Sequence, residues 1–391
     1  MKFCIWLLIP FLFSSCCGKV RYAVPEDLVD CAQVCGVRDV RAFGGESTCH
    51  FRQDFARVLR EEIEEKGLDP EETYSVLAIS GGAANGAYGA GLLNGWSDSG
   101  TRPVFKVVTG ISTGAITAPF AFLGSEYDCV IKEFYTEYST RDIMRIRFPR
   151  FMIPVKSSIA TTIPMKRLLN HYIDMEVLKK ISAEYRKGRR LYVGTTNMDT
   201  QELVVWDMGK IASCENLRSL ELFRKIVLAS ASIPVFFQPI YFRVEIDGKQ
   251  YEEMHVDGGL SKQVFFIDDV IRGLDEITQK RQDEFFKSRY HLYLIRNGYA
   301  TPLYEEVPDK IFPIADRALD TLINSQSLGD LYHIYLCVKD LGGDFNLAHI
   351  PESHVSHARE FLDPVEMRIL FNLGYDEALE GYRWKKSPPA S

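Results

Sequence analysis

The chain has 391 residues, and 46% of them are apolar, so it can form one large α/β domain with additions or two domains. The formal net charge is −7 at pH 7. This charge argues against a general nucleic-acid binder, because such a protein usually carries a basic face.

The N-terminus has the features of an export signal. Met1-Lys2 precedes an apolar run over residues 3–13, which is too short for an ordinary transmembrane helix, and Ser14-Ser15-Cys16 follows. Residues 1–16 resemble a bacterial lipoprotein signal, in which Cys16 would become the lipid-bearing first residue. The residue after Cys16 is not Asp, which favours the outer membrane of a cell envelope over the inner one. A cleaved signal peptide of a secreted or periplasmic protein is the alternative, and Cys17 is a competing lipidation site.

Residues 17–70 are predicted to be a tether followed by a leading amphipathic helix over residues 52–66. Three cysteines of this segment (Cys31, Cys35 and Cys49) cluster, so an export-linked disulfide is plausible without a defined pairing. Cys129, Cys214 and Cys337 are expected to be small buried apolar groups.

Residues 71–391 are predicted to form a single catalytic domain. Its first four elements are a strand over 74–79, a helix over 84–97, a strand over 104–109 and a helix over 113–123. Two strands joined by a helix imply a parallel sheet with a right-handed crossover. One face of the first helix carries only small residues, Gly82, Gly86 and Ala90. We expect this face to pack closely against the helix over 113–123.

The later elements continue the α/β pattern. We expect helices over 127–138, 165–187, 217–229, 314–339 and 363–382, a strand pair over 191–197 and 202–207, a hairpin over 235–244 and 250–256, and a strand over 291–295.

The pentapeptide Gly110-Ile111-Ser112-Thr113-Gly114 lies between a strand-like run and a helix-like run. That setting suits a nucleophile elbow, in which a sharp turn holds the serine oxygen out at the end of a strand. Gly110 and Gly114 allow the neighbouring backbone to approach closely. Ser112 is therefore the candidate nucleophile.

Two more strand ends carry motifs. The turn Ser80-Gly81-Gly82-Ala83-Ala84-Asn85-Gly86 points backbone N–H groups and a helix N-terminus at one spot, which suits an anion. The segment Asp257-Gly258-Gly259 places a carboxylate at a strand end with no side-chain bulk in the next two residues.

Together these segments resemble the patatin-like phospholipase family over residues 74–270, including Ala229–Pro234, which is similar to an Ala-Ser-x-x-(apolar)-Pro segment of the family. The resemblance implies a three-layer α/β/α sandwich with a mostly parallel central sheet, and hydrolysis of lipid acyl esters without metal or cofactor. It implies a Ser112–Asp257 dyad, an oxyanion hole from the N–H groups of Gly81, Gly82 and Ala83, and supporting roles for the other motif residues (Asn85, Gly86, Gly110, Gly114, Gly258 and Gly259). Ala83 replaces the expected third glycine but keeps its N–H. Asn85 stands where Arg or Lys is common, so the sequence does not indicate which lipid head group is bound.

Three alternatives remain at this point. An α/β-hydrolase triad would draw its histidine from those after Asp257 (His291, His333, His349, His354 and His357) or from His255, which shares a strand face with Asp257. An inactive envelope lipoprotein could use the same fold to bind lipid or a protein partner. A dinucleotide site at Gly81–Gly86 would need an acid at the end of the next strand, which ends in the elbow instead.

Overall fold

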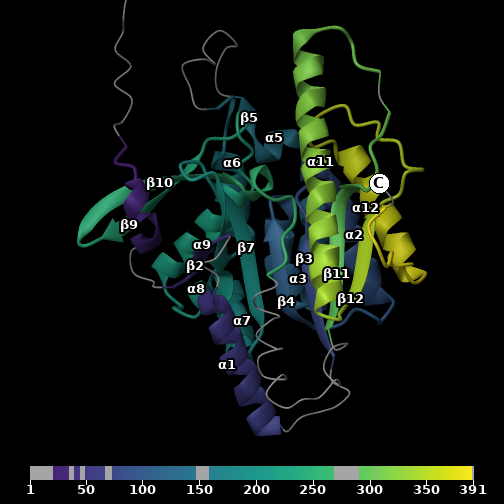
Figure 1. The fold of residues 1–391 in the computed structure, drawn as a ribbon. Coiled ribbons are helices and arrows are strands. Elements are labelled where there is room, and N and C mark those ends of the chain that lie inside the picture. Colours follow the sequence, from purple (N-terminus) through teal and green to yellow (C-terminus); the bar gives the residue numbers. More distant parts are fainter. Residues whose placement is uncertain are drawn as a thin grey trace, which may run out of the picture.

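A computed structural model of the protein describes residues 21–34, 39–44, 49–66, 73–146, 158–267, 290–304 and 306–389. It has the predicted α/β/α architecture, with a mostly parallel central sheet between two layers of helices (Figure 1). Cys16 and Cys17 lie outside the described residues.

Five parallel strands form the centre of the sheet. In spatial order they are β7 (Arg190–Asn197), β4 (Phe105–Ile111), β3 (Tyr74–Ile79), β11 (Tyr290–Tyr299) and β12 (Asp344–Ile350). Their runs of buried residues are typical of strands covered on both faces. Beyond these strands the pairing is antiparallel. β7 pairs with both β8 (Glu202–Asp207) and β10 (Lys249–Asp257), and β10 pairs in turn with β9 (Ile240–Ile246).

Each face of the sheet has its own hydrophobic cluster, because side chains alternate along a strand. Leu77 and Ile79 of β3 point to one face, and Val76 and Ala78 point to the other. The first face is covered by α2 (Gly86–Asp98), α3 (Thr113–Leu123), α4 (Asp128–Thr136), α7 (Met175–Arg186), α9 (Leu217–Ser230) and α12 (Pro364–Leu379). The second face is covered by α1 (Cys49–Lys66) and the long α11 (Ile311–Asp340), which stands in front of the sheet in Figure 1.

Several predictions about single elements are wrong. The single helix expected over 165–187 is two helices, α6 (Ile163–Tyr172) and α7, because the Asp174 side chain accepts from the Val177 N–H and starts a new helix. The strand β12 was not predicted at all, and the hairpin strand β9 begins at Ile240 and not at Val235. Cys129 and Cys214 are exposed, so they are not buried apolar groups.

Part of the expected tether belongs to the sheet. β1 (Gln33–Val34) pairs with β9, and β2 (Arg41–Phe43) pairs with β8. The Arg41 guanidinium forms an ion pair with the buried carboxylate of Glu253 on β10. This segment therefore packs against the same strands that lead to the candidate site. No helix in the described part of the chain has the length and apolar character needed to cross a bilayer.

Glycines allow two helices to touch at backbone level. A Cβ atom on Gly91 of α2 would lie 1.9 Å from the Phe371 carbonyl oxygen of α12, and one on Gly374 would lie 2.3 Å from the Tyr88 carbonyl oxygen. Gly86 makes the predicted approach to α3, where its Cβ would meet the Thr113 side chain. The closest backbone packing of α2, however, is against α12 and was not predicted.

We expect Gly91→Ala to lower the free energy of unfolding by about 1–3 kcal/mol, because the new methyl group meets backbone that cannot move locally. Gly329→Ala in α11 is the matched control, since a Cβ there meets nothing within 4 Å. The control should raise the free energy of unfolding by about 0.5–1 kcal/mol, because alanine favours a helix interior. Urea unfolding of the three proteins compares them, and equal midpoints for Gly91→Ala and the parent protein would contradict the packing argument.

Candidate active site

Ser112 occupies a strained turn between β4 and α3. Its backbone angles are φ 55° and ψ −122°, an unfavourable region for a residue with a side chain. A Cβ on Gly110 would lie 2.4 Å from the Gly114 carbonyl oxygen, and one on Gly114 would lie 2.3 Å from the Ile79 carbonyl oxygen. Only glycine fits at both positions, so the two glycines permit the sharp turn that exposes the Ser112 oxygen to the site.

Asp257 meets Ser112 because two strands share one edge of β7. The parallel strand β4 pairs with β7 as far as Ile111 opposite Gly194. The antiparallel strand β10 takes over the same edge, with Asp257 opposite Thr195. The ends of β4 and β10 therefore point at each other, and the Ser112 hydroxyl donates to Asp257 Oδ2 at 2.6 Å.

Burial controls the charge of Asp257. The carboxyl group is removed from solvent, and this desolvation raises its pKa to about 7 from the ordinary 3.8. The Ser112 hydroxyl and the Gly259 N–H, which donates to Oδ1 at 2.7 Å, act in the opposite direction by stabilising the carboxylate. A carboxyl group with a pKa near neutrality is a better proton acceptor than an exposed aspartate.

The segment Ala229–Pro234 connects both halves of this pair. The Ser230 hydroxyl accepts from the Ser112 N–H at 2.9 Å and donates to the Gly194 carbonyl at 2.6 Å. Ser232 lies only two positions further along the chain, and its carbonyl accepts from the Asp257 N–H at 3.0 Å. The segment thus positions the serine and the aspartate together.

The glycine-rich loop lies directly against Ser112. A Cβ on Gly81 would be 3.2 Å from the Ser112 Cβ. The Gly81 N–H, however, donates to the Gln263 carbonyl at 3.0 Å, so it is not free to bind an oxyanion as predicted. No described residue accepts from the N–H groups of Gly82 or Ala83, which remain the candidate donors.

The backbone of this loop is left-handed at both candidate donors. Gly82 has φ 152° and Ala83 has φ 48°. A Cβ on Gly82 would lie 2.0 Å from the Asn297 carbonyl oxygen, so glycine is required there. Asn85 closes the turn by donating its N–H to the Gly82 carbonyl at 3.0 Å.

Asn297 lies near the carboxyl end of β11 and holds the glycine-rich loop in place. It was not among the predicted site residues. Its N–H donates to the Ser80 hydroxyl at 2.8 Å, and its side-chain amide donates to the Ser80 carbonyl at 3.0 Å and accepts from the Gly89 N–H at 3.2 Å. A polar residue just after the core of a parallel strand was the available signal, because site residues gather at that edge. Gln263 had no comparable signal, since its role depends on a backbone carbonyl.

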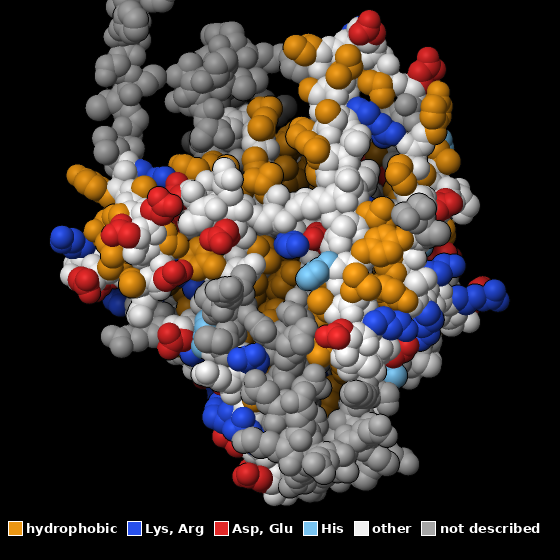
Figure 2. Space-filling model, viewed as in Figure 1, with side chains coloured by type: hydrophobic (Ala, Val, Ile, Leu, Met, Phe, Trp, Pro, Cys, Tyr) orange, Lys and Arg blue, Asp and Glu red, His pale blue; other side chains and the backbone are white. Residues whose placement is uncertain are grey.

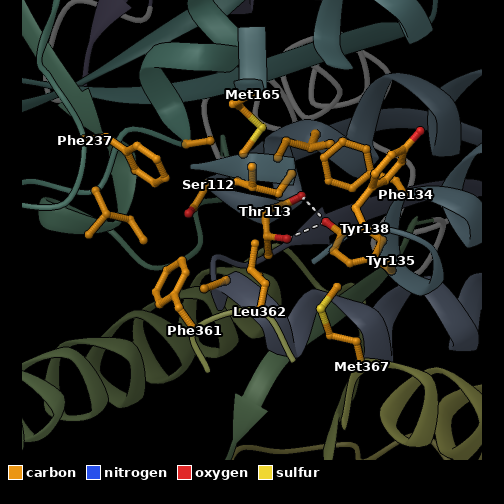
Figure 3. Close-up of a pocket in the computed structure, with 15 residues that line it drawn as sticks. Ser112, Thr113, Phe134, Tyr135, Tyr138, Met165, Phe237, Phe361, Leu362 and Met367 are labelled. Atoms are coloured by element: carbon orange, nitrogen blue, oxygen red, sulfur yellow. Dashed lines mark hydrogen bonds between the residues drawn. The ribbon is translucent and has the colours of Figure 1, made fainter. Parts of the chain in front are cut away.

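An apolar pocket opens in front of Ser112 (Figure 3). Among its residues are Ile116, Phe134, Met165, Phe237 and Phe361. Among the described residues, no charged side chain lines this pocket, and its polar side-chain groups are the hydroxyls of Ser112, Thr113 and two tyrosines. Such a lining suits an aliphatic chain with one reactive polar end at the serine.

Four of the described histidines form side-chain hydrogen bonds away from the serine–aspartate pair. His255 is buried, and its ring nitrogens contact Thr195 Oγ1 at 2.9 Å and Glu253 Oε2 at 3.2 Å. His291, His349 and His354 pair with Asp344, the Ile350 carbonyl and Glu366. None of the described histidines hydrogen-bonds to Ser112 or Asp257, and the described residues contain no cluster of metal-ligating side chains.

This fold and site define an α/β protein with a serine elbow facing a buried aspartate. The model of the patatin-like phospholipase family matches residues 77–269, so this part of the chain is a patatin-like phospholipase domain. The match contains both Ser112 and Asp257. No curated protein sequence matches the chain.

Among solved structures, the crystal structure of VipD from Legionella pneumophila is similar to this protein, with 13% sequence identity and a TM-score of 0.33. The alignment covers 79% of this chain and 66% of that chain. These values are too low to transfer any property from it.

We expect Asp257→Asn to stabilise the protein at high pH. The pKa of Asp257 is about 7 in the folded protein, above the ordinary 3.8. The contribution of Asp257 to the free energy of unfolding is therefore most favourable below pH 3.8 and is lost as the pH rises through 7. The three-unit shift corresponds to at most about 4 kcal/mol above pH 7.

Urea unfolding at pH 4.5 and pH 8 measures the effect. The free energy of unfolding of Asp257→Asn should exceed that of the parent protein at pH 8, and the difference should shrink at pH 4.5. Comparing the two proteins at each pH cancels the contributions of all other titrating groups. A difference that does not change with pH would show that Asp257 titrates as it does in water.

We expect Ala83→Gly to leave the acylation rate within a few-fold of the parent rate, because the N–H donor survives. Glycine also removes the cost of a left-handed alanine, about 1–2 kcal/mol, and adds about 0.5–1 kcal/mol of unfolded-state entropy. Acylation by one activated ester measures the rate. A proline at this position would not isolate the donor, since its φ near −65° cannot match the observed 48°. A loss of two orders of magnitude in Ala83→Gly would assign a role to the Ala83 methyl group.

Proposed function

We propose that this protein is a serine acyl hydrolase that cleaves acyl esters of phospholipids or related lipids, of the phospholipase A or lysophospholipase type. The observation that carries the proposal is the 2.6 Å hydrogen bond from the Ser112 hydroxyl to a desolvated Asp257, made at one end of an apolar pocket. The match of residues 77–269 to the patatin-like phospholipase family supports a lipid hydrolase in general terms.

In the proposed reaction the Asp257 carboxylate takes the Ser112 proton as the serine oxygen attacks the ester carbonyl. The Gly82 and Ala83 N–H groups donate to the developing oxyanion, while the acyl chain lies along the pocket. The protonated Asp257 then returns its proton to the departing lysolipid or alcohol oxygen. The resulting acyl-enzyme is hydrolysed by a water molecule that Asp257 deprotonates, which releases the fatty acid and restores Ser112.

We expect Ser112→Ala to lower kcat/KM by more than about 1,000-fold and Asp257→Asn to lower it by about 100-fold or more. A short-chain aryl ester and a phospholipid panel provide the assays. Ser213→Ala and Asp309→Asn are matched controls, because both side chains are exposed and neither lines the pocket. For the parent protein, kcat/KM should rise with pH and level off above about pH 7, since only deprotonated Asp257 accepts a proton.

The outcomes separate this proposal from its two rivals. Undiminished turnover by folded Ser112→Ala would eliminate the nucleophile. A parent protein that neither turns over ester nor reacts with a serine-directed phosphonate would be an inactive lipid-binding scaffold. A folded histidine variant as inactive as Asp257→Asn would favour the triad.

We also propose that Cys16 carries lipid and anchors the protein in a cell envelope, as the N-terminal sequence indicates. Mass spectrometry of the mature N-terminus should find an acylated Cys16, and Cys16→Ser should shift the protein from the membrane fraction. An intact Met1 or an unmodified N-terminus would overturn this expectation.

A further inference from the structure

Exposed apolar side chains surround the pocket on the side of the sheet where the parallel strands end. Ile163, Val235, Phe236 and Leu260 are all exposed large hydrophobic residues. Each lies within three residues of Met165 or Phe237 in the pocket, or of Asp257. Leaving such side chains in water is unfavourable, so this gathering indicates a surface that binds something apolar.

These residues are continuous with the pocket itself. The Phe236 ring stacks on Phe361 with centroids 5.5 Å apart, and Phe361 lines the pocket. The backbone here is fixed, because the Val235 and Phe236 carbonyls accept from the N–H groups of Ile159 and Ala160 at 2.8 and 2.9 Å. The exposed side chains therefore form a rigid rim.

The N-terminal half of α11 extends this rim. Ile311 is 78% exposed, Leu319 58% and Leu322 67%, whereas Leu331, Ile334 and Val338 further along the helix are buried. Ile311, Ala315, Leu319 and Leu322 follow the spacing of one helical stripe. The Gln326 side chain, four residues after Leu322, donates to the Leu260 carbonyl at 3.4 Å, which ties the helix to the rim.

The figures show the same arrangement. The upper half of α11 rises beyond the sheet in Figure 1, and Figure 2 shows hydrophobic side chains gathered along that upper edge.

Positive charge accompanies the apolar rim. Residues 141–167 contain seven basic residues and one acidic residue, in a chain whose net charge is −7. Four of the basic side chains are described and exposed: Arg141, Arg145, Lys166 and Arg167. They flank Ile143 and Met165 of the pocket. An anionic surface complements this combination of cations and apolar side chains.

Arg21, the first described residue, lies at the same end of the strands as the pocket. Arg21 donates to both carboxylate oxygens of Asp199 at 2.7 and 2.6 Å, and Asp199 follows the carboxyl end of β7. Since β7 is parallel to β4, this end of β7 is on the Ser112 side of the sheet. Cys16 precedes Arg21 by five residues, which span at most about 18 Å. A lipid on Cys16 would thus enter a bilayer on this side.

We propose that this edge is a docking face for a bilayer that contains anionic phospholipid. The docking face consists of Ile163, Val235, Phe236, Leu260 and the exposed stripe of α11, together with Arg141, Arg145, Lys166 and Arg167. The apolar side chains enter the interface, the cations contact the head groups, and the pocket receives an acyl chain from the lipid layer. The inference rests on the proposed lipid hydrolase function and on the orientation that Cys16 implies.

The test uses the full chain with Cys16→Ser and Cys17→Ser, so that no lipid is attached. Vesicles of phosphatidylcholine with and without phosphatidylglycerol serve as probes. Sedimentation with vesicles measures binding, and hydrolysis of vesicle lipid is compared with hydrolysis of a soluble short-chain ester. Leu319→Asp/Leu322→Asp should weaken vesicle binding and vesicle hydrolysis by about tenfold or more, with the soluble ester turned over within about twofold of the parent rate.

Val104→Asp/Leu217→Asp is the matched control. Val104 is 77% exposed and Leu217 73% exposed, and they precede β4 and begin α9 at the opposite edge of the sheet. The control should bind vesicles like the parent chain. Lys166→Glu/Arg167→Glu should abolish the preference for phosphatidylglycerol by weakening binding to anionic vesicles about tenfold. All variants share one N-terminal segment, so their differences report the docking face.

The two proposals fail separately. Normal vesicle binding by Leu319→Asp/Leu322→Asp, or an equal loss in the control, would overturn the docking face even if the ester is hydrolysed. Self-association removed by the same substitutions, with vesicle binding unchanged, would assign the stripe to a second copy of the chain and would also overturn it. Vesicle binding that depends on the face in a protein without ester hydrolysis would support docking and reject the proposed function.

Discussion

The central constraint in this structure is that two strands end against each other on one edge of β7. The parallel strand β4 ends with Ile111 opposite Gly194, directly before Ser112, and the antiparallel strand β10 ends with Asp257 opposite the next residue, Thr195. Neither strand can continue, so both must turn away at once. The strained φ of Ser112 and the small residues after Asp257 follow from this crowding, since a Cβ on Gly258 would lie 2.4 Å from the Gly194 carbonyl oxygen.

The same crowding supplies the chemistry. Because the two strand ends fill the space between them, water is excluded and the pKa of Asp257 rises to about 7. Serine hydroxyls and backbone amides, rather than a histidine or a second charge, provide the hydrogen bonds around the pair. The fold thereby places a carboxyl group with a pKa near neutrality beside a serine hydroxyl, at the cost of burying an ionisable group.

Much of this was predictable from local sequence. The elbow glycines, the Asp-Gly-Gly turn and the alternation of strands with helices are signals that lie within a few neighbouring residues. The Gly-rich turn was also recognisable, but its donors were not: Gly81 is occupied by the carbonyl of Gln263, and Asn297 fixes the loop from more than 200 residues away. Such contacts depend on register between distant strands, which no local pattern contains.

Other elements were missed for similar reasons. β12 includes polar residues such as Asp344 and Asn346, so its sequence lacks the apolar run of a buried strand. β1 and β2 consist of two and three residues, and they are strands only because β9 and β8 offer free edges. The break between α6 and α7 required recognising Asp174 as an N-cap within a longer helical pattern.

The pair and its supports come from parts of the chain that are far apart: 145 residues separate Ser112 from Asp257, 118 separate Ser112 from Ser230, and 217 separate Ser80 from Asn297. Folding is slow when such distant segments must meet, because the chain loses loop-closure entropy before the stabilising contacts form. A nascent chain that has reached only Gly259 already contains Ser112 and Asp257 but still lacks β11, whose Asn297 holds the glycine-rich loop. The proposed activity would therefore arise late in synthesis and folding, and a chain cut short before β11 would lack the complete candidate site.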